Sequence, residues 1–198
     1  MPRVPAGIRR GQLVEAAVRV AARDGVAATT TRAIATEAGT SLASVHYYFD
    51  SKQELLREVL ISIINELTDG SPPSSGGGTD VATLARGELR ALFEVVEREP
   101  GKQQVTYELT HHALRTEELT GLARWQYESY DERAQTRLRE LASAAGAEWT
   151  LPLPVVARLL LNTIDGVVLR WLVDRDSEAA LAVLDSFADT LGSLARRV

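Results

Sequence analysis

The stretch Ser41-Leu-Ala-Ser-Val-His-Tyr-Tyr-Phe49 decides the fold of this chain. It predicts a short helix with an exposed aromatic and polar face. A helix ending at Ala38-Gly39 precedes it, and Asp50-Ser51-Lys52 and another helix follow it. Helix, glycine turn and short helix form the pattern of a helix-turn-helix. Because so short a helix is poorly stable alone, its neighbours must hold it, and a short helix held in this way fits the major groove of DNA.

Helical periodicity extends to both sides of this segment. We expect a first helix near residues 9–23, ended by Asp24-Gly25, and a second helix that begins after Thr29-Thr30-Thr31 and ends at Gly39. Ser51-Lys-Gln-Glu54 has the form of a capping box, in which a serine and a glutamate satisfy free amides at a helix start. This box predicts a long fourth helix with an apolar stripe.

The remaining chain predicts five more helices and a loop. Residues 69–78, Asp-Gly-Ser-Pro-Pro-Ser-Ser-Gly-Gly-Gly, predict a flexible loop because they cannot bury apolar surface. The later helices are expected near 79–98, 101–117, 118–145, 153–174 and 177–196. No segment alternates convincingly as a strand. The sequence therefore predicts an all-α fold of about nine helices.

Composition excludes several classes of protein. The 198 residues include no cysteine, which rules out disulfides, thiol catalysis and thiolate metal sites. No apolar run approaches the roughly 20 residues of a membrane span, and the first residues lack an apolar signal core. We therefore expect a cytoplasmic protein without a membrane partner. The net charge is −5. Residues 1–60 carry eight Arg and Lys against six acids, so a mildly basic head precedes an acidic body.

The order of segments resembles the TetR family of transcriptional regulators. The resemblance lies in Ala16-Ala-Val-Arg-Val-Ala-Ala-Arg-Asp-Gly25, Thr30-Thr-Arg-Ala-Ile-Ala-Thr-Glu-Ala-Gly39 and Thr40-Ser-Leu-Ala-Ser-Val-His-Tyr-Tyr-Phe-Asp-Ser-Lys52. It implies an N-terminal helix-turn-helix domain at residues 1–52, which binds DNA. It also implies a C-terminal helical domain at 53–198 that dimerises and holds a small ligand.

The resemblance implies that the third helix enters the major groove while flanking residues hold phosphates. The implied DNA-binding residues are Thr31, Arg32, Ser41, Leu42, Ala43, Ser44, His46, Tyr47, Tyr48 and Lys52. Packing for one of the two tyrosines, and solvated surface charge for Arg32 and Lys52, are the alternatives. The third helix has no Arg, Lys, Asn or Gln, so the commonest bidentate base contacts are unavailable. Sequence choice then depends on thymine methyls, on His46 and on DNA shape. Arg3, Arg9 and Arg10 could add phosphate or minor-groove contacts.

Aromatic and polar side chains of the body are candidates for a ligand pocket, because such pockets combine apolar walls with a few polar groups. The candidates are Phe93, Tyr107, His111, Trp125, Tyr127, Asn162 and Asp165. Tyr107 and His111 are four residues apart and share a helix face. Asp165-Gly166 within an apolar helix is unusual, because a buried aspartate is costly unless it is paired. An ordinary aromatic core and a close helix crossing at a dimer interface are the alternatives.

The last two helices are the most apolar and predict a four-helix bundle with their copies across a two-fold axis. The expected interface residues are Leu159, Val167, Trp171, Leu184, Phe187 and Leu191. The alternative is that these side chains form the core of a single subunit.

The leading functional hypothesis is a homodimeric repressor that binds a pseudo-palindromic operator and is released by a small hydrophobic or aromatic ligand. The alternative is a DNA-binding dimer without a small effector, acting as an activator or answering to a protein partner. We predict no enzyme, no cofactor and no metal site. The histidines lack a nucleophile elbow or a metal-spaced partner, and Gly76-Gly77-Gly78 does not form a phosphate-binding loop.

Overall fold

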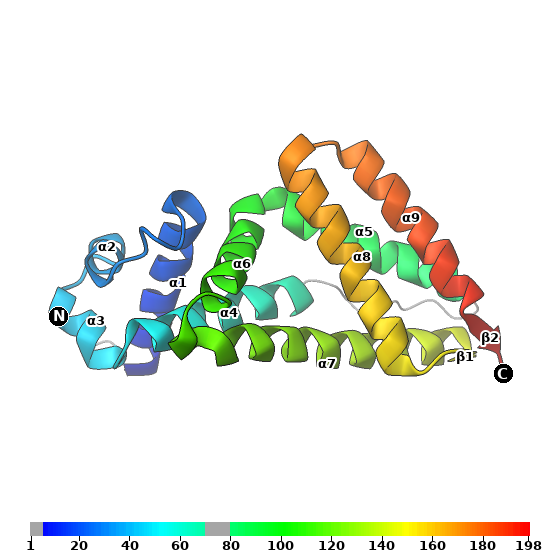
Figure 1. The fold of residues 1–198 in the computed structure, drawn as a ribbon, viewed down its shortest axis with the longest axis horizontal. Helices are drawn as coiled ribbons and strands as arrows, with labels where there is room; N and C mark the ends of the chain where they lie inside the picture. The colour runs from blue at the N-terminus through cyan, green and yellow to red at the C-terminus, as the bar shows by residue number, and fades with distance from the viewer. Residues whose placement is uncertain (1–5, 70–79) are drawn as a thin grey trace. The chain divides into compact units, whose positions relative to one another are not determined.

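The computed structural model describes residues 6–69 and 80–198. Within these ranges nine α-helices and one short 3-10 helix follow one another, and this confirms the all-α fold that the sequence predicted (Figure 1). The helices are α1 (Ala6–Asp24), α2 (Thr31–Glu37), α3 (Leu42–Tyr48), α4 (Lys52–Asp69), α5 (Val81–Arg98), α6 (Pro100–Ala113), the 3-10 helix η1 (Glu117–Leu119), α7 (Thr120–Ala145), α8 (Leu153–Asp174) and α9 (Ser177–Ser193). Except for Asp69, the predicted loop 69–78 lies outside the described residues.

Short polar side chains set where the helices of the head begin. The hydroxyl of Thr30 accepts the Ala33 amide at the start of α2, and that of Ser41 accepts the Ser44 amide at the start of α3. Ser51 accepts the Glu54 amide at 3.1 Å, as the capping box predicts. The Glu54 carboxylate, however, accepts from Asp50 rather than from the serine amide. The Ala33 and Glu54 amides lie in a first helical turn, which leaves such amides without a helical backbone partner, whereas the Ser44 amide also donates to the Ser41 carbonyl.

The chain divides into two compact units. The first contains residues 1–66 and 99–125, and therefore α1, α2, α3, most of α4, α6 and the start of α7. The second contains residues 67–98 and 126–198. In this division most of α4 and all of α6 fall in the same unit as α1, α2 and α3, and the boundary between residues 52 and 53 stays a prediction.

Helix α6 joins the first unit through one close contact with the end of α1 and one with the turn that follows it. A Cβ added at Gly101 would lie 2.7 Å from the carbonyl oxygen of Ala22, so only glycine lets the helices approach this closely. Seven residues further on, the Glu108 carboxylate accepts the backbone N–H of Val26 at 2.7 Å. This amide belongs to the turn between α1 and α2, so α6 fixes both the end of α1 and the turn that follows it.

The second unit is built around α5, α8 and α9. Helix α5 packs along α9, and α9 also packs on α8. Phe93 of α5 meets Trp171 of α8 edge to face, with ring centroids 5.4 Å apart, and the Trp171 indole N–H donates to the Ser177 hydroxyl. Outside this apolar layer, Arg86 and Arg90 of α5 pair with Asp185 of α9.

Two three-residue strands are a departure from the predicted structure. We expected the last helix to reach residue 196, but α9 ends at Ser193 and β2 (Ala195–Arg197) pairs antiparallel with β1 (Ala147–Trp149) (Figure 1). Gly146, at φ 61°, ends α7 in the left-handed conformation that glycine tolerates. Three residues are too few to show an alternating pattern, so only pairing between distant segments creates these strands.

Candidate nucleic-acid interface

Helix α3 is held by one face and exposed on the other. Val45 is fully buried and Phe49 is 4% exposed, so these two side chains anchor the helix. Leu42, Ala43 and His46 are exposed on the opposite face, together with Tyr47 at 77%. The exposed face therefore combines apolar side chains with side chains that can form hydrogen bonds, and the major groove offers partners for both.

The two adjacent tyrosines of α3 have different environments. Tyr47 is the more exposed of the two, whereas Tyr48 is half-buried. Their rings meet edge to face at 5.0 Å. The Tyr47 ring therefore projects from the face of α3, while the half-buried Tyr48 ring contacts it.

Exposed groups at two helix starts flank α3. Arg32 is exposed and Thr31 is half-buried in the first turn of α2, and Lys52 is exposed at the start of α4. Helix starts present free amides and a partial positive charge, which suit phosphate oxygens. Ser41 and Ser44 lie at the start of α3, where the Ser41 hydroxyl already caps the helix.

Three other cations of the head, Arg10, Arg19 and Arg23, are committed to internal ion pairs. Arg10 pairs with Glu54 and Glu58 at 2.9 Å, and its guanidinium lies 4.8 Å from the centre of the Phe49 ring. Arg19 and Arg23 both pair with Glu37 of α2. Arg10 is therefore held within the head, although its sequence position suggested a DNA contact. Arg9 is half-buried, and Arg3 lies outside the described residues.

The predicted ligand residues fall in both compact units. Tyr107, His111 and Trp125 belong to the first unit, where Tyr107 and Trp125 are half-buried and His111 is exposed. The guanidinium of Arg57 lies 5.3 Å from the centre of the Trp125 ring.

The remaining four, Phe93, Tyr127, Asn162 and Asp165, belong to the second unit. Phe93 is 1% exposed and contributes to the core, while Asn162 is exposed. The Tyr127 hydroxyl donates to the Asp165 carboxylate at 3.2 Å, so this aspartate of an apolar helix is paired. Burial first, and then the negative charge of Asp165, raise the pKa of Tyr127 to about 12. Tyr127 also meets Tyr130 edge to face at 5.8 Å.

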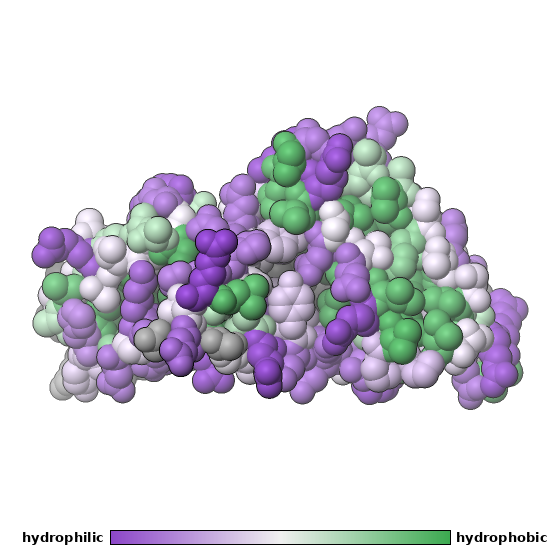
Figure 2. Space-filling view, viewed as in Figure 1, coloured by the Kyte–Doolittle hydropathy of each residue, from purple (hydrophilic) through white to green (hydrophobic). Residues whose placement is uncertain are grey.

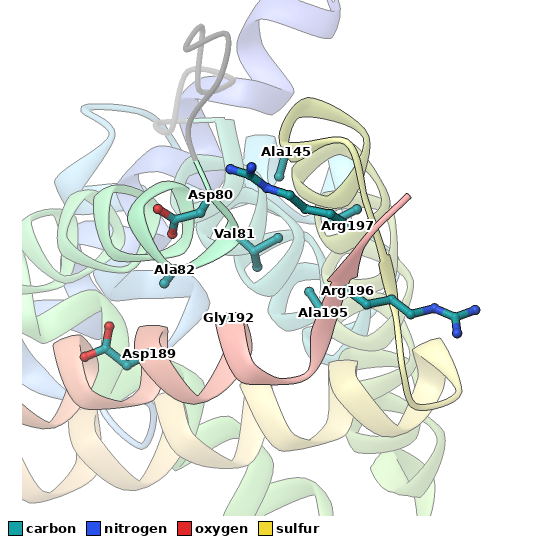
Figure 3. Close-up of a pocket in the computed structure, with 10 residues that line it drawn as sticks. Asp80, Val81, Ala82, Ala145, Asp189, Gly192, Ala195, Arg196 and Arg197 are labelled. Atoms are coloured by element: carbon teal, nitrogen blue, oxygen red, sulfur yellow. The ribbon is translucent and has the colours of Figure 1, made fainter.

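A pocket of about 270 Å³ lies elsewhere in the second unit, where α5 begins and α9 ends (Figure 3). None of the predicted ligand residues lines it; the walls are Asp80, Val81, Ala82, Ala145, Ala147, Asp189, Gly192, Ala195, Arg196 and Arg197. In Figure 3 the Arg196 side chain extends away from the other lining residues, and its guanidinium lies 3.5 Å from Glu148. Sequence reasoning missed this pocket because its walls come from helix ends and from the unexpected strands.

The predicted dimer residues divide into buried and exposed groups. Trp171, Leu184 and Leu191 are at most 4% exposed and belong to the core of the second unit. Val167 and Phe187 are half-buried, and Leu159 is 40% exposed. Four further apolar side chains of α8 and α9, which were not among the predicted interface residues, are exposed like Leu159. Together with Leu159 they form the α8/α9 face: Val155, Leu159, Leu169, Val173 and Val183.

The α8/α9 face follows helix geometry. Its four α8 members recur at intervals that bring them to one side of the helix, with Asn162 and Gly166 between them. Figure 2 shows hydrophobic side chains gathered over α8 and α9. A Cβ added at Gly166 would meet nothing within 4 Å. The helix surface is therefore open at this point within the chain.

None of the helices in the described part of the chain combines the length and apolar composition that crossing a membrane requires.

Comparison with known proteins agrees with this geometry. Residues 13–59 match the family model described as bacterial regulatory proteins, tetR family. The chain is 29% identical over 188 residues to the nicotine-responsive transcriptional repressor HdnoR of Paenarthrobacter nicotinovorans, covering 93% of this chain and 96% of that protein. It is also 29% identical over 185 residues to the regulator BetI of Rhizobium meliloti, covering 92% and 88%.

Solved structures share the fold. The multidrug binding protein EbrR, complexed with imidazole, is 28% identical with a TM-score of 0.65 over 94% of this chain and 93% of that one. A transcriptional regulator from Rhodococcus sp. Rha1 has a TM-score of 0.76 at 22% identity, over 96% and 98% of the two chains. With its matching head and helical body, this chain is similar over more than 90% of its length to helix-turn-helix transcriptional regulators, and its head at residues 13–59 matches the tetR family model.

Proposed function

We propose that this protein is a homodimeric repressor that binds a pseudo-palindromic operator and leaves it when a small effector binds. The observation that carries the proposal is the exposed face of α3, which buried Val45 and Phe49 hold away from the core. A helix held in this way can place its exposed side chains against base edges in the major groove.

On this proposal residues 1–52 read DNA. Base contacts come from the exposed face of α3 and phosphate contacts from the flanking helix starts. The proposed contacts are Thr31, Arg32, Ser41, Leu42, Ala43, Ser44, His46, Tyr47, Tyr48 and Lys52. Arg32 and Lys52 support this assignment because both are exposed while Arg10, Arg19 and Arg23 are paired internally.

Residues 53–198 dimerise on this proposal. The α8/α9 face supports it, because an exposed apolar stripe on two neighbouring helices can form a four-helix bundle with its copy. A two-fold axis presents two copies of α3, and successive major grooves on one side of the duplex are about 34 Å apart. The operator is then an inverted repeat whose half-sites are separated by about one helical turn.

The effector is proposed to bind the body, with Tyr107, His111 and Trp125 as the candidate residues of the first unit and Phe93, Tyr127, Asn162 and Asp165 as those of the second unit. It releases DNA if it binds better to a conformation whose two heads do not fit successive grooves. Because HdnoR is named as nicotine-responsive and matches nearly the whole chain, nicotine is the first compound to test.

The test begins with duplexes selected from a randomised pool by the purified protein. We expect an inverted repeat, bound with a salt-sensitive dissociation constant measured by fluorescence anisotropy. Nicotine and related aromatic amines are then titrated into the complex. Failure to select any sequence would reject the proposal. A stable complex that no small molecule releases would favour the second candidate, a DNA-binding dimer without a small effector.

A further inference from the structure

Two opposite charges line the pocket at the start of α5 without meeting one another. In the described part of the chain, neither Asp80 nor Arg197 forms an ion pair, although both belong to the pocket walls. A third charged wall residue, Asp189, is already paired with Arg86 of α5. A molecule that carries both charges can bridge the gap between the free carboxylate and the free guanidinium.

The pleat of the two short strands determines which arginine faces the pocket. Ala147 stands opposite Arg197 in the register, and opposing residues of an antiparallel pair share one face. Arg196 therefore lies on the other face, where its guanidinium is 3.5 Å from the carboxylate of Glu148. In Figure 3 the Arg197 side chain turns from β2 toward Asp80, whereas the Arg196 side chain extends away. The strands thus present one unpaired arginine to the pocket.

The carboxylate of Asp80 is a fixed anion at the opposite wall. It accepts the Thr83 amide at 2.9 Å and the Thr83 hydroxyl at 3.1 Å, and so caps the start of α5. The Thr83 amide, and then the Thr83 hydroxyl, hold the pKa of the Asp80 carboxyl below its usual range. Because each oxygen of a carboxylate can accept more than one hydrogen bond, Asp80 can cap the helix and still accept from a ligand.

The walls between these two charges are apolar and small. A Cβ added at Gly192 would lie 2.8 Å from the Cβ of Ala82, so α9 and α5 touch at this wall. The volume of about 270 Å³ is just below the roughly 300–1,000 Å³ of drug-sized sites. No aromatic ring lines the pocket, so its shape and chemistry suit a short aliphatic chain; the apolar wall residues are Val81, Ala82, Ala145, Ala147 and Ala195.

We propose that this pocket binds a small aliphatic zwitterion of the amino-acid type, whose carboxylate contacts Arg197 and whose ammonium group contacts Asp80. A simple anion would be repelled by Asp80 and a simple cation by Arg197, whereas a zwitterion satisfies both charges. The pocket contains none of the seven residues proposed for the effector. The inference is therefore independent of the proposed function, and it is tested on the protein without DNA.

The experiment titrates glycine, β-alanine and γ-aminobutyrate, which separate the two charges by increasing distances, into the full-length protein. Acetate and methylammonium serve as probes with a single charge, and amide chemical shifts in NMR spectra report binding. Arg197→Gln removes the cation. Asp80→Asn removes the anion and keeps a cap for α5, because asparagine caps helices as well as aspartate does. The matched control is Arg139→Gln, an exposed arginine of α7 outside the pocket.

We expect at least one zwitterion to shift the amides of Val81 and Ala195 and to bind more tightly than acetate or methylammonium. Arg197→Gln and Asp80→Asn should each weaken that binding by up to about fivefold, because an exposed ion pair contributes at most about 1 kcal/mol. Arg139→Gln should bind like the wild type. The proposal is overturned if no zwitterion shifts these amides, if a single-charge probe binds equally well, or if both pocket variants bind like the wild type. Retained dispersion of the remaining amide signals checks that each variant is folded.

Discussion

At the scale of the residue, the head separates its cations into two groups. Arg10, Arg19 and Arg23 hold helices together, whereas Lys52 at the start of α4 is free to meet a phosphate. We expect Lys52→Ala to weaken binding to all duplexes and to reduce the slope of log affinity against log salt by about one for each phosphate that the lysine neutralises. The measurement is anisotropy at several salt concentrations. The control is Lys102→Ala, because Lys102 pairs with Glu66 of α4 and with Glu99. An unchanged salt slope would contradict the role of Lys52.

Glu54 is the residue at which pH and folding of the head are linked. The Asp50 amide, and then Arg10, hold the pKa of the Glu54 carboxyl below its usual range. Its contribution to stability is therefore present above the pKa of the unfolded chain and disappears as pH falls through the lower folded value. We expect Glu54→Gln to lower the melting temperature at pH 7 by more than at pH 3, with a free-energy change at pH 7 below about 1 kcal/mol because the pair is partly exposed. Equal losses at both pH values would refute this linkage.

At the scale of the element, α6 depends on its close approach to α1 at Gly101. Gly101→Ala would place a Cβ 2.7 Å from the Ala22 carbonyl oxygen, so we expect the unfolding free energy to fall by about 1–3 kcal/mol because the helices are forced apart. Gly87→Ala in α5 is the control, since a Cβ there would meet nothing within 4 Å. Alanine favours a helix interior by about 0.8–1 kcal/mol over glycine, so the control should gain stability. Urea unfolding of both variants makes the comparison, and a stabilised Gly101→Ala protein would refute the close approach.

At the scale of the whole molecule, the α8/α9 face decides whether two heads act together. Leu169 is 52% exposed, and Leu169→Glu places a charge within that face. We expect the variant to sediment as a monomer and to bind the operator far more weakly, because one head reaches only one half-site and a buried charge is costly in a dimer interface. Circular dichroism should remain unchanged.

The matched control for the dimer is Leu114→Glu, because Leu114 follows α6 and is 67% exposed but lies outside the α8/α9 face. It should leave the sedimentation coefficient unchanged. If Leu169→Glu remains dimeric, the bundle proposed for α8 and α9 is wrong, and another surface must join the subunits.

The local structure of the head could be predicted from its sequence because short-range chemistry determines it. Thr30, Ser41 and Ser51 cap the helices that follow them, and Gly25 and Gly39 adopt the positive φ of a helix-ending turn. Each of these features depends on atoms within a few residues of one another, so the sequence alone could predict it.

The pairing of distant segments was decided only by the tertiary structure. The apolar pattern assigned both Leu159 and Leu184 to the expected dimer interface. Within the subunit, however, Leu159 is 40% exposed and Leu184 is 1% exposed. The two strands, and the hydrogen bond from the Val26 amide to Glu108, likewise join residues far apart in the chain. Hydropathy indicates that a side chain will be buried but not which residue will pack against it. The packing partner depends on how whole helices pack together.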